Sequence, residues 1–195
     1  MIRFSDVERW HRRLCTVTDQ IIISGDLSED PARAVEQIGE WQQAGISHVL
    51  DTRLEWSDEG LVADYAPKIV YGWIGTDDDG AAKPDEWFDA GIAFATDALR
   101  NRESTLLVHC HMGINRGPSM AFRVLLESEW DPIEALDAIR DSRPIAGVVY
   151  APDALGHYHR AHDVPADHRS NDRDRVTAWR SGYPTTGIRL TRRPD

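Results

Sequence analysis

A short apolar segment that runs straight into a tight turn and then a helix constrains the fold of this chain more than any other feature. Residues 104–108 read Ser-Thr-Leu-Leu-Val, which is typical of a short buried strand. Pro118 stands where the first turn of a helix begins, a position at which its missing N–H costs nothing. Residues 120–126 continue as mostly apolar. The pattern predicts a strand over 104–108, a tight loop, and a helix over 117–129.

The loop between this strand and this helix carries residues suited to one kind of chemistry. Cys110 lies at the strand end and faces the helix N-terminus, where the helix dipole favours a thiolate. Arg116 stays charged and can direct two donors at phosphate oxygens. Gly113 lets the backbone approach an anion, and the N–H groups of the loop can turn inward. The expected phosphate-binding residues are His111, Met112, Gly113, Ile114, Asn115 and Arg116. A thiolate attacking a bound phosphate ester is the predicted reaction.

At these residues the chain resembles a known family. The motif His109-Cys110-x-x-Gly113-x-x-Arg116 is similar to the signature loop of the cysteine-based protein tyrosine phosphatases, and its flanks most resemble the dual-specificity branch. The resemblance covers about residues 15–162, including segments 21–25, 44–50, 132–140 and 143–144. It implies a phosphatase of phosphotyrosine and phosphoserine or phosphothreonine in proteins, with a phosphocysteine intermediate and no cofactor. It also implies that His109 holds the loop through a hydrogen bond, with Ser119 as a second supporting residue.

One position departs from the family pattern. The family usually has Ser or Thr directly after the arginine, where the hydroxyl helps the thiolate leave, and this chain has Gly117. The departure implies slow turnover, or a phosphate-binding pseudophosphatase that does not turn over. Ser119 is the candidate to replace the missing hydroxyl. A second expectation is that Gly117 holds a backbone angle that serine tolerates poorly.

The reaction also needs an acid to protonate the leaving oxygen. Three successive aspartates, Asp77, Asp78 and Asp79, follow an expected strand and precede an expected helix. In the dual-specificity enzymes the acid lies about thirty residues before the cysteine, just after such a strand. This spacing favours Asp78, with Asp77 and then Asp79 as the alternatives. The three residues could also form a solvated turn that only caps a helix.

Two other phosphate substrates deserve comparison with phosphoproteins. The segment Gly113-Ile114-Asn115-Arg116 resembles the loop of cysteine-type RNA triphosphatases, which makes the 5′ end of RNA an alternative. The net charge of −11 counts against a nucleic-acid partner. An inositol phospholipid is a further alternative, although the loop lacks the lysines that such relatives carry. We therefore expect a phosphorylated protein or peptide as substrate, and no nucleic acid or membrane partner.

Charge divides the chain into two parts. Residues 164–195 contain seven arginines and four aspartates, so this tail carries +3 and the remaining residues −14. The tail shows little periodicity, and we expect an extended or partly disordered arm. Its aromatic residues Trp179 and Tyr183 suggest packing on the body. The expected division is a phosphatase domain over 1–163 followed by this arginine-rich tail, with the oligomeric state left open.

Cysteine usage and hydropathy bear on the compartment. The chain has two cysteines, Cys15 and Cys110, so a disulfide framework is not expected and a reducing cytoplasm suits a reactive thiol. Cys15 is expected to be an ordinary buried cysteine, with a protective bond to Cys110 as the alternative. No run of eighteen apolar residues occurs, and residues 1–6 lack the apolar core of a signal peptide.

The remaining pattern alternates strands with helices. Strands are expected at 19–25, 48–53 and 69–75, and helices at 30–43, 84–100, from 131 and at 151–162. Such alternation predicts an α/β fold, with a mainly parallel central sheet of four to five strands flanked by helices and ligands at the carboxyl ends of the strands. Asp51-Thr52-Arg53 resembles a strand-end Asp-x-Arg of some bacterial relatives, where it supports the loop; a surface ion pair is the alternative.

Histidines do not indicate a metal site in this pattern. His111 could be grouped with His157, His159 and His162, but residues two apart on a helix do not share a face. The predicted chemistry also needs no metal. We therefore expect none.

Overall fold

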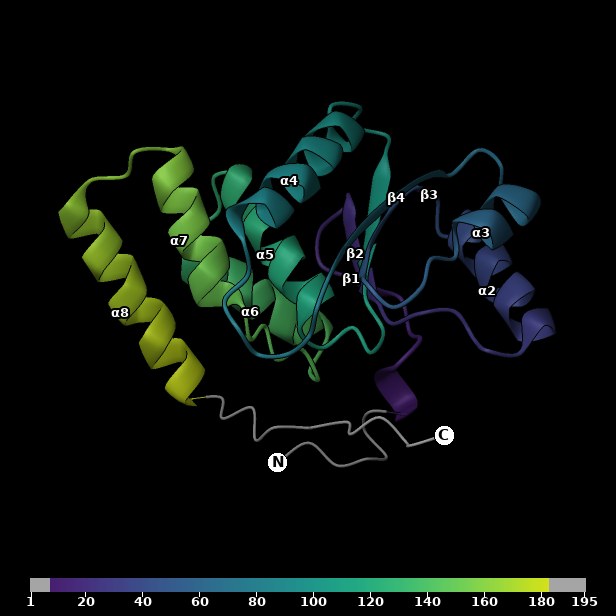
Figure 1. Cartoon of the computed structure of the whole chain (residues 1–195), viewed down its shortest axis with the longest axis horizontal. Helices are drawn as coiled ribbons and strands as arrows, with labels where there is room; N and C mark the ends of the chain where they lie inside the picture. The colour runs from purple at the N-terminus through teal and green to yellow at the C-terminus, as the bar shows by residue number, and fades with distance from the viewer. Residues whose placement is uncertain (1–7, 183–195) are drawn as a thin grey trace.

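A five-stranded sheet lies at the centre of the computed structural model, which describes residues 8–182 (Figure 1). The strand order is β1-β2-β5-β3-β4. The strands are β1 Cys15–Thr16, β2 Ile21–Ser24, β3 Ile46–Arg53, β4 Val70–Thr76 and β5 Thr105–His109. Only the β1–β2 pair among them is antiparallel; β2, β5, β3 and β4 run parallel. The predicted α/β class with a mainly parallel sheet is confirmed.

Helices cover both faces of the sheet (Figure 1). The helices are α2 Pro31–Gln43, α3 Glu59–Tyr65, α4 Asp85–Leu99, α5 Arg116–Glu127, α6 Pro132–Ser142, α7 Ala151–Ala161 and α8 Ala166–Gly182. One face packs against α2 and α3 through a core that includes Ile38, Trp41 and Leu107. The other face packs against α4, α5, α6 and α7 through a core that includes Val108 and Phe122. Burial on both faces explains why β5 is apolar throughout rather than alternating.

Two helices begin where their capping residues predict. The Asp30 carboxylate accepts a hydrogen bond from the Arg33 N–H at 2.9 Å, and Pro31 is the first residue of α2. The Asp131 carboxylate accepts from the N–H groups of residues 133 and 134 in the same way, at 2.9 and 3.3 Å, ahead of Pro132. Local sequence therefore determines the starts of α2 and α6.

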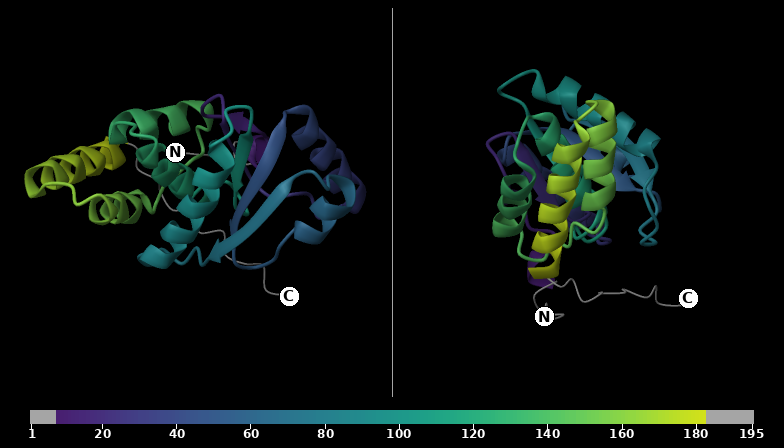
Figure 2. Two further views of the ribbon diagram at one scale, coloured as in Figure 1. Left: turned by 90° about the horizontal axis from the view of Figure 1, so that it is seen from above. Right: turned by 90° about the vertical axis from the view of Figure 1, so that its left-hand side faces the viewer.

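The tail is different from its expected form. Residues 166–182 form the regular helix α8, which lies beside α7 at one end of the molecule (Figures 1 and 2), so the expectation of an extended arm is wrong there. The buried Val176 side chain and the Trp179 ring pack against the main core, and Trp179 Nε1 donates to Asp137 Oδ1 at 2.6 Å. Arg175 Nη2 pairs with Asp131 Oδ1 at 2.7 Å. The predicted packing of Tyr183 lies outside the described residues. Nearly all other positions of α8 are polar, and tertiary contacts of these few residues decide its conformation.

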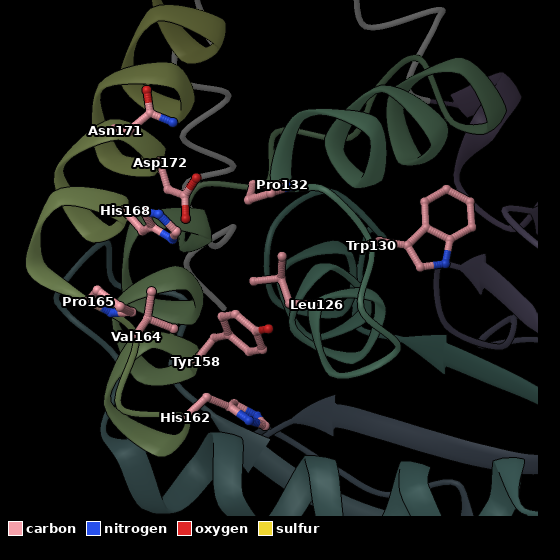
Figure 3. A pocket seen from close by; sticks show the side chains of 10 residues that line it. All are labelled: Leu126, Trp130, Pro132, Tyr158, His162, Val164, Pro165, His168, Asn171 and Asp172. Atoms are coloured by element: carbon pink, nitrogen blue, oxygen red, sulfur yellow. The ribbon is translucent and has the colours of Figure 1, made fainter.

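Helix α8 forms one wall of an open cavity of about 500 Å³. Leu126 of α5, Tyr158 of α7 and His168 of α8 face this space (Figure 3). The cavity includes no residue of the loop between β5 and α5. Within residues 8–182, no helix combines the length and apolar character needed to cross a bilayer.

Candidate active site

The loop between β5 and α5 has its carbonyl groups turned outward. Cys110 follows the last residue of β5, and Arg116 is the first residue of α5. The His111 carbonyl accepts from the Asp26 N–H at 3.0 Å, and the Ile114 carbonyl accepts from the Gly147 N–H at 2.8 Å. The Met112 and Gly113 carbonyls accept from a buried arginine, Arg143, at 2.9 and 2.6 Å. Each of these carbonyls is therefore held by a group outside the loop.

The opposite side of the loop presents main-chain N–H groups. In a peptide unit the N–H points away from the C=O, so carbonyls turned outward leave the following N–H groups turned inward. Among the described residues, the N–H groups of 111–115 donate no hydrogen bond to protein. Several free N–H groups on one curved loop at a helix N-terminus form an anion-binding nest. Phosphate binding by residues 111–116 stays a prediction.

Arg143 is the residue that fastens this loop to the N-terminal part of the chain. Its guanidinium also donates to the carbonyls of His11 and Arg13 at 3.0 and 3.1 Å, and to Cys15 Sγ at 3.3 Å. Its side chain is buried, and none of these partners is a carboxylate. Burial lowers the pKa of Arg143 below its usual range. The resemblance to the family includes Arg143-Pro144 but does not predict these contacts, which together clamp the loop to the N-terminal segment.

Gly113 is required for a different reason from the one predicted. Its φ is +61°, a left-handed conformation that side chains other than glycine rarely adopt. A Cβ atom there would lie 2.5 Å from both the Arg143 guanidinium and the Ser24 carbonyl. Gly113 therefore lets the loop close over Arg143; the predicted close approach of phosphate to this glycine stays a prediction.

The Arg116 guanidinium is hydrogen-bonded to protein through its two terminal nitrogens, and its Nε differs from them. Its two terminal nitrogens bind the Glu55 carboxylate at 2.7 and 2.9 Å, and Nη1 also donates to the Thr76 carbonyl at 2.8 Å. Its Nε is buried and has no hydrogen-bond partner in the part of the chain that the structure describes, with Asp78 Oδ2 at 3.9 Å. Burial alone would lower the pKa of Arg116, but the Glu55 contact, with Cys110 and Asp78 nearby, raises it. The guanidinium is thus charged, oriented, and left with a buried donor that lacks an acceptor.

Glu55 is a site residue that sequence reasoning missed. It lies in the segment between β3 and α3, sixty-one positions before Arg116. Burial would raise the pKa of Glu55, and the hydrogen bonds that it accepts from Arg116 lower it below its usual range. Glu55 orients the guanidinium. No local motif marks this glutamate, because its partner is reached only through the parallel pairing of β3 with β5.

Of the three candidate acids, the structure brings Asp78 to the loop. Tyr150 Oη donates to Asp78 Oδ1 at 2.6 Å, and Asn115 Nδ2 lies 3.4 Å from both carboxylate oxygens. Asp79 instead pairs with Lys83 Nζ at 2.6 Å, and its side chain is 55% exposed. Burial and the Asp78 contact raise the pKa of Tyr150, so its hydroxyl stays protonated and can donate. Tyr150 was not predicted as a site residue, and its role as a partner of Asp78 arises from the α7 N-terminus.

His109 does not support the loop in the way the resemblance implied. Its ring is fully buried, and neither ring nitrogen has a hydrogen-bond partner among residues 8–182. Burial lowers the pKa of His109, which favours the neutral ring. The main chain is held instead, because Thr52 Oγ1 donates to the His109 carbonyl at 2.7 Å. The expected hydrogen bond of the His109 ring is therefore wrong.

Ser119 supports Tyr150, the residue that bonds Asp78. Its hydroxyl accepts from the Tyr150 N–H at 3.1 Å, which places Tyr150 near Asp78. No hydrogen bond joins this hydroxyl to Cys110 among the described residues. Ser119 therefore fixes the start of α7, and its expected replacement of the hydroxyl that Gly117 lacks stays a prediction.

The Asp51-Thr52-Arg53 segment is a buried support and not a surface ion pair. Both charged side chains are fully buried, and Arg53 binds Asp51 through Nε at 2.9 Å and Nη2 at 2.7 Å. Arg53 Nη2 also contacts Asp58 at 2.6 Å. Together with the Thr52 bond to β5, this arrangement holds the carboxyl end of β3 beside the loop.

The remaining sequence candidates lie apart. His157 bonds Asp89 and Arg123, His159 bonds Asp172, and His162 bonds Glu127, so these three histidines do not gather with His111. Cys15 and Cys110 are both buried and free. The Cys15 thiol lies against Arg143, which makes it a contact of the loop's clamp rather than a bonded partner of Cys110.

A sequence relative and two solved structures are similar to this chain. No family model matches the chain. Dual specificity protein phosphatase 13B of Mus musculus is 29% identical over 150 residues, which cover 71% of this chain and 73% of the mouse protein. The chain is related to the dual-specificity phosphatases. Human DUSP28 has the same fold, with a TM-score of 0.61 and 16% identity over 76% of this chain and 94% of that one. PTPMT1 superposes with a TM-score of 0.58 and 16% identity, over 85% of this chain and 99% of its own.

This relative of the dual-specificity phosphatases has Gly117 where the family pattern has Ser or Thr. The structure shows a different obstacle to a side chain at this position from the one expected. The φ of Gly117 is not positive, so the expectation that its backbone angle excludes serine is wrong. A Cβ there would lie 3.1 Å from the His109 carbonyl carbon and 3.2 Å from the Cys110 nitrogen. A side chain requires the strand end to move by a few tenths of an ångström.

We expect Gly117→Ser to change the rate-limiting step. A hydroxyl next to Cys110 can hydrogen-bond the departing thiolate, which contributes about 1.4 kcal/mol, or roughly tenfold in rate. Rapid mixing with nitrophenyl phosphate should show a burst followed by a slow steady state in the natural protein, and a smaller burst with a faster steady state in the variant. Gly39→Ser, in an open position of α2, is the matched control. Absence of a burst in the natural protein, with efficient turnover, would show that another group assists the thiolate.

Proposed function

We propose that this chain hydrolyses phosphate monoesters of proteins, on tyrosine and on serine or threonine, through a phosphocysteine intermediate. One observation supports this function most directly. The buried Arg116 Nε has no acceptor, and it lies on the same loop as the inward N–H groups and Cys110. A tetrahedral phosphate dianion supplies acceptors for all of these donors.

In the first step, the Cys110 thiolate attacks phosphorus and the bond from phosphorus to the leaving oxygen breaks. The nest and Arg116 hold the equatorial oxygens, where negative charge is present in the transition state. Asp78 gives its proton to the leaving oxygen. Tyr150 and Asn115 support this role, because they orient the carboxyl group at the edge of the loop next to Arg116. The products of the step are an alcohol or phenol and a phosphocysteine.

In the second step, water attacks the phosphocysteine and the bond from phosphorus to sulfur breaks. Asp78, now a carboxylate, accepts the water proton, so inorganic phosphate leaves and the Cys110 thiolate is restored. No hydroxyl at position 117 stabilises the departing thiolate. Breakdown of the intermediate is therefore the slow step in this proposal.

Phosphorylated protein is favoured over the two alternative substrates. The mouse relative is named a dual specificity protein phosphatase. PTPMT1 has been crystallised with PI(5)P, which makes a phosphoinositide the second candidate. Residues 110–116 contain no lysine, and the carboxylates of Glu55 and Asp78 lie beside Arg116, which disfavours polyanionic lipids and RNA.

A parallel assay separates the candidates. Phosphotyrosyl peptide, phosphoseryl peptide, triphosphorylated RNA and phosphoinositide should be compared at equal concentration, with released phosphate as the readout. We expect the peptides to give the highest kcat/KM, and the Cys110→Ser protein to give none. Preferred hydrolysis of RNA or lipid would identify that class of molecule, and not phosphorylated protein, as the substrate. Turnover no greater than that of Cys110→Ser on all four would indicate a pseudophosphatase.

Asp78→Asn tests the acid. An alkyl or peptide leaving group needs protonation, whereas nitrophenolate leaves readily without it, so the loss should be about a hundredfold or more on phosphopeptide and much smaller on nitrophenyl phosphate. Asp79→Asn is the matched control, because that neighbouring carboxylate pairs with Lys83. Equal losses on both substrates, or a larger effect of Asp77→Asn, would remove Asp78 from this role.

A further inference from the structure

Two histidines and one aspartate meet at the phosphate loop, which is the segment between β5 and α5 (residues 110–115). Their side chains take no part in the proposed chemistry. His11, Asp26 and His111 each offer one ligand atom, and these atoms lie within 4.8 Å of one another. His11 Nε2 is 2.9 Å from Asp26 Oδ1, and His111 Nδ1 is 2.6 Å from Asp26 Oδ2. The three residues come from the segment before β1, the segment after β2 and the phosphate loop.

Asp26 is buried without a full set of partners. Its side chain is 3% exposed, and within residues 8–182 Oδ1 accepts no hydrogen bond of good geometry, although Arg12 Nη2 lies 3.3 Å away. His11 Nε2 lies near this oxygen but bonds the His111 carbonyl at 2.8 Å instead. A buried carboxylate oxygen without a proper donor is costly unless a cation or further donor reaches it. Asp26 thus points at the space between the two imidazoles with an unused acceptor.

The Asp26 carboxylate also faces two guanidinium groups. Arg12 Nη2 lies 3.3 Å from Asp26 Oδ1, and Arg53 Nη1 lies 3.9 Å from Asp26 Oδ2.

We propose that His11, Asp26 and His111 form a Zn²⁺ site that joins the N-terminal segment to the phosphate loop. Two imidazole nitrogens and one carboxylate oxygen are a ligand set that zinc accepts with a water in the fourth position. The side chains of His11 and His111 are 14% and 39% exposed, so an ion can enter from solvent. Contraction of the ligand atoms around the ion displaces Arg12, whose Nη2 is 3.3 Å from Asp26 Oδ1.

The site is separate from the proposed phosphate chemistry. His111 directly follows Cys110, and its ring packs edge-on against Trp56 at 5.4 Å between centroids. Its Nδ1 faces Asp26. The zinc ion would hold the outer side of the loop, and its coordination by His11 Nε2 would replace the hydrogen bond of that nitrogen to the His111 carbonyl. The role of the zinc ion would be structural. A variant without phosphatase activity, such as Cys110→Ser, should therefore still bind zinc.

Zinc binding should be measured in the Cys110→Ser protein, which removes the Cys110 thiol, next to His111, as a competing ligand. The protein is stripped with a chelator and titrated with Zn²⁺ against a chromophoric chelator, and Co²⁺ absorption reports the ligand type. We expect one equivalent to bind, with a Co²⁺ spectrum that lacks a sulfur charge-transfer band. His11→Gln and His111→Gln should each weaken binding by about a hundredfold or more, because each removes a direct ligand.

Two further variants separate a metal site from an ordinary ion pair. Arg12→Gln should bind Zn²⁺ more tightly, because a competing positive charge is gone, whereas His162→Gln should bind as the parent does. Circular dichroism of each variant verifies folding. Stoichiometric zinc binding that survives both His11→Gln and His111→Gln would overturn the proposal, as would the absence of stoichiometric binding in the parent. A Zn²⁺-induced rise in melting temperature that both ligand variants lose would support it.

Discussion

Cys110→Ser should bind oxyanions normally and hydrolyse nothing. A serine hydroxyl is a far weaker nucleophile than a thiolate. We expect kcat to fall on the order of a millionfold, as it does when a nucleophile is removed from other covalent enzymes. The main-chain nest and Arg116 do not depend on the sulfur. Calorimetry with tungstate should therefore give an affinity within a few-fold of the natural protein.

Cys15→Ser is the matched control for this substitution. Cys15 is also buried, and its sulfur accepts from Arg143, a role that a hydroxyl oxygen can take over. We expect this variant to keep most of its activity. Measurable turnover by Cys110→Ser, above that of a mock preparation, would show that another group attacks phosphorus.

Arg116→Lys should have the second-largest effect. The natural guanidinium binds Glu55 and the Thr76 carbonyl with its terminal nitrogens and still presents Nε to the loop. A lysine has one nitrogen, and Glu55 would draw that ammonium away from the phosphate. We expect kcat/KM to fall by about a hundredfold to a thousandfold, as when one transition-state donor is lost. Steady-state kinetics on a phosphotyrosyl peptide measures the change.

Arg123→Lys provides the comparison, because Arg123 is buried on the same helix but pairs with Glu127 and His157. Its substitution should lower the melting temperature and leave kcat/KM within a few-fold. Should Arg116→Lys likewise retain kcat/KM within a few-fold, Arg116 would be a structural residue rather than a ligand of the phosphate. A rise in activity on adding Glu55→Gln to Arg116→Lys would identify Glu55 as the group that captures the lysine.

Local features of the sequence predict the centre of the site well. The strand, loop and helix around Cys110 are contiguous, and their signals are an apolar β segment, a glycine and a proline at a helix start. Asp30-Pro31 and Asp131-Pro132 determine two further helix starts in the same way. The parallel sheet follows from alternation of strands and helices. These features need no knowledge of distant contacts.

Residues that orient the site from a distance could not be predicted in this way. Glu55, Tyr150 and Arg143 carry no local motif, and each reaches the loop through strand pairing or helix packing between segments far apart in the chain. The prediction of an extended arm at residues 166–182 was wrong for a related reason. The pattern of these residues is polar almost throughout, and their conformation depends on contacts that Val176 and Trp179 make with the body.

The clamp made by Arg143 has a consequence for the order in which the chain acquires its site. The carbonyls of His11 and Met112 share this one guanidinium, and the first of them lies 132 positions before it in sequence. During synthesis from the N-terminus, the phosphate loop therefore remains without its clamp until the segment after α6 has been made. Removal of the segment before β1 would take away the other half of the same contact. Cleavage between His11 and β1 would thus affect the loop without touching Cys110 or Arg116.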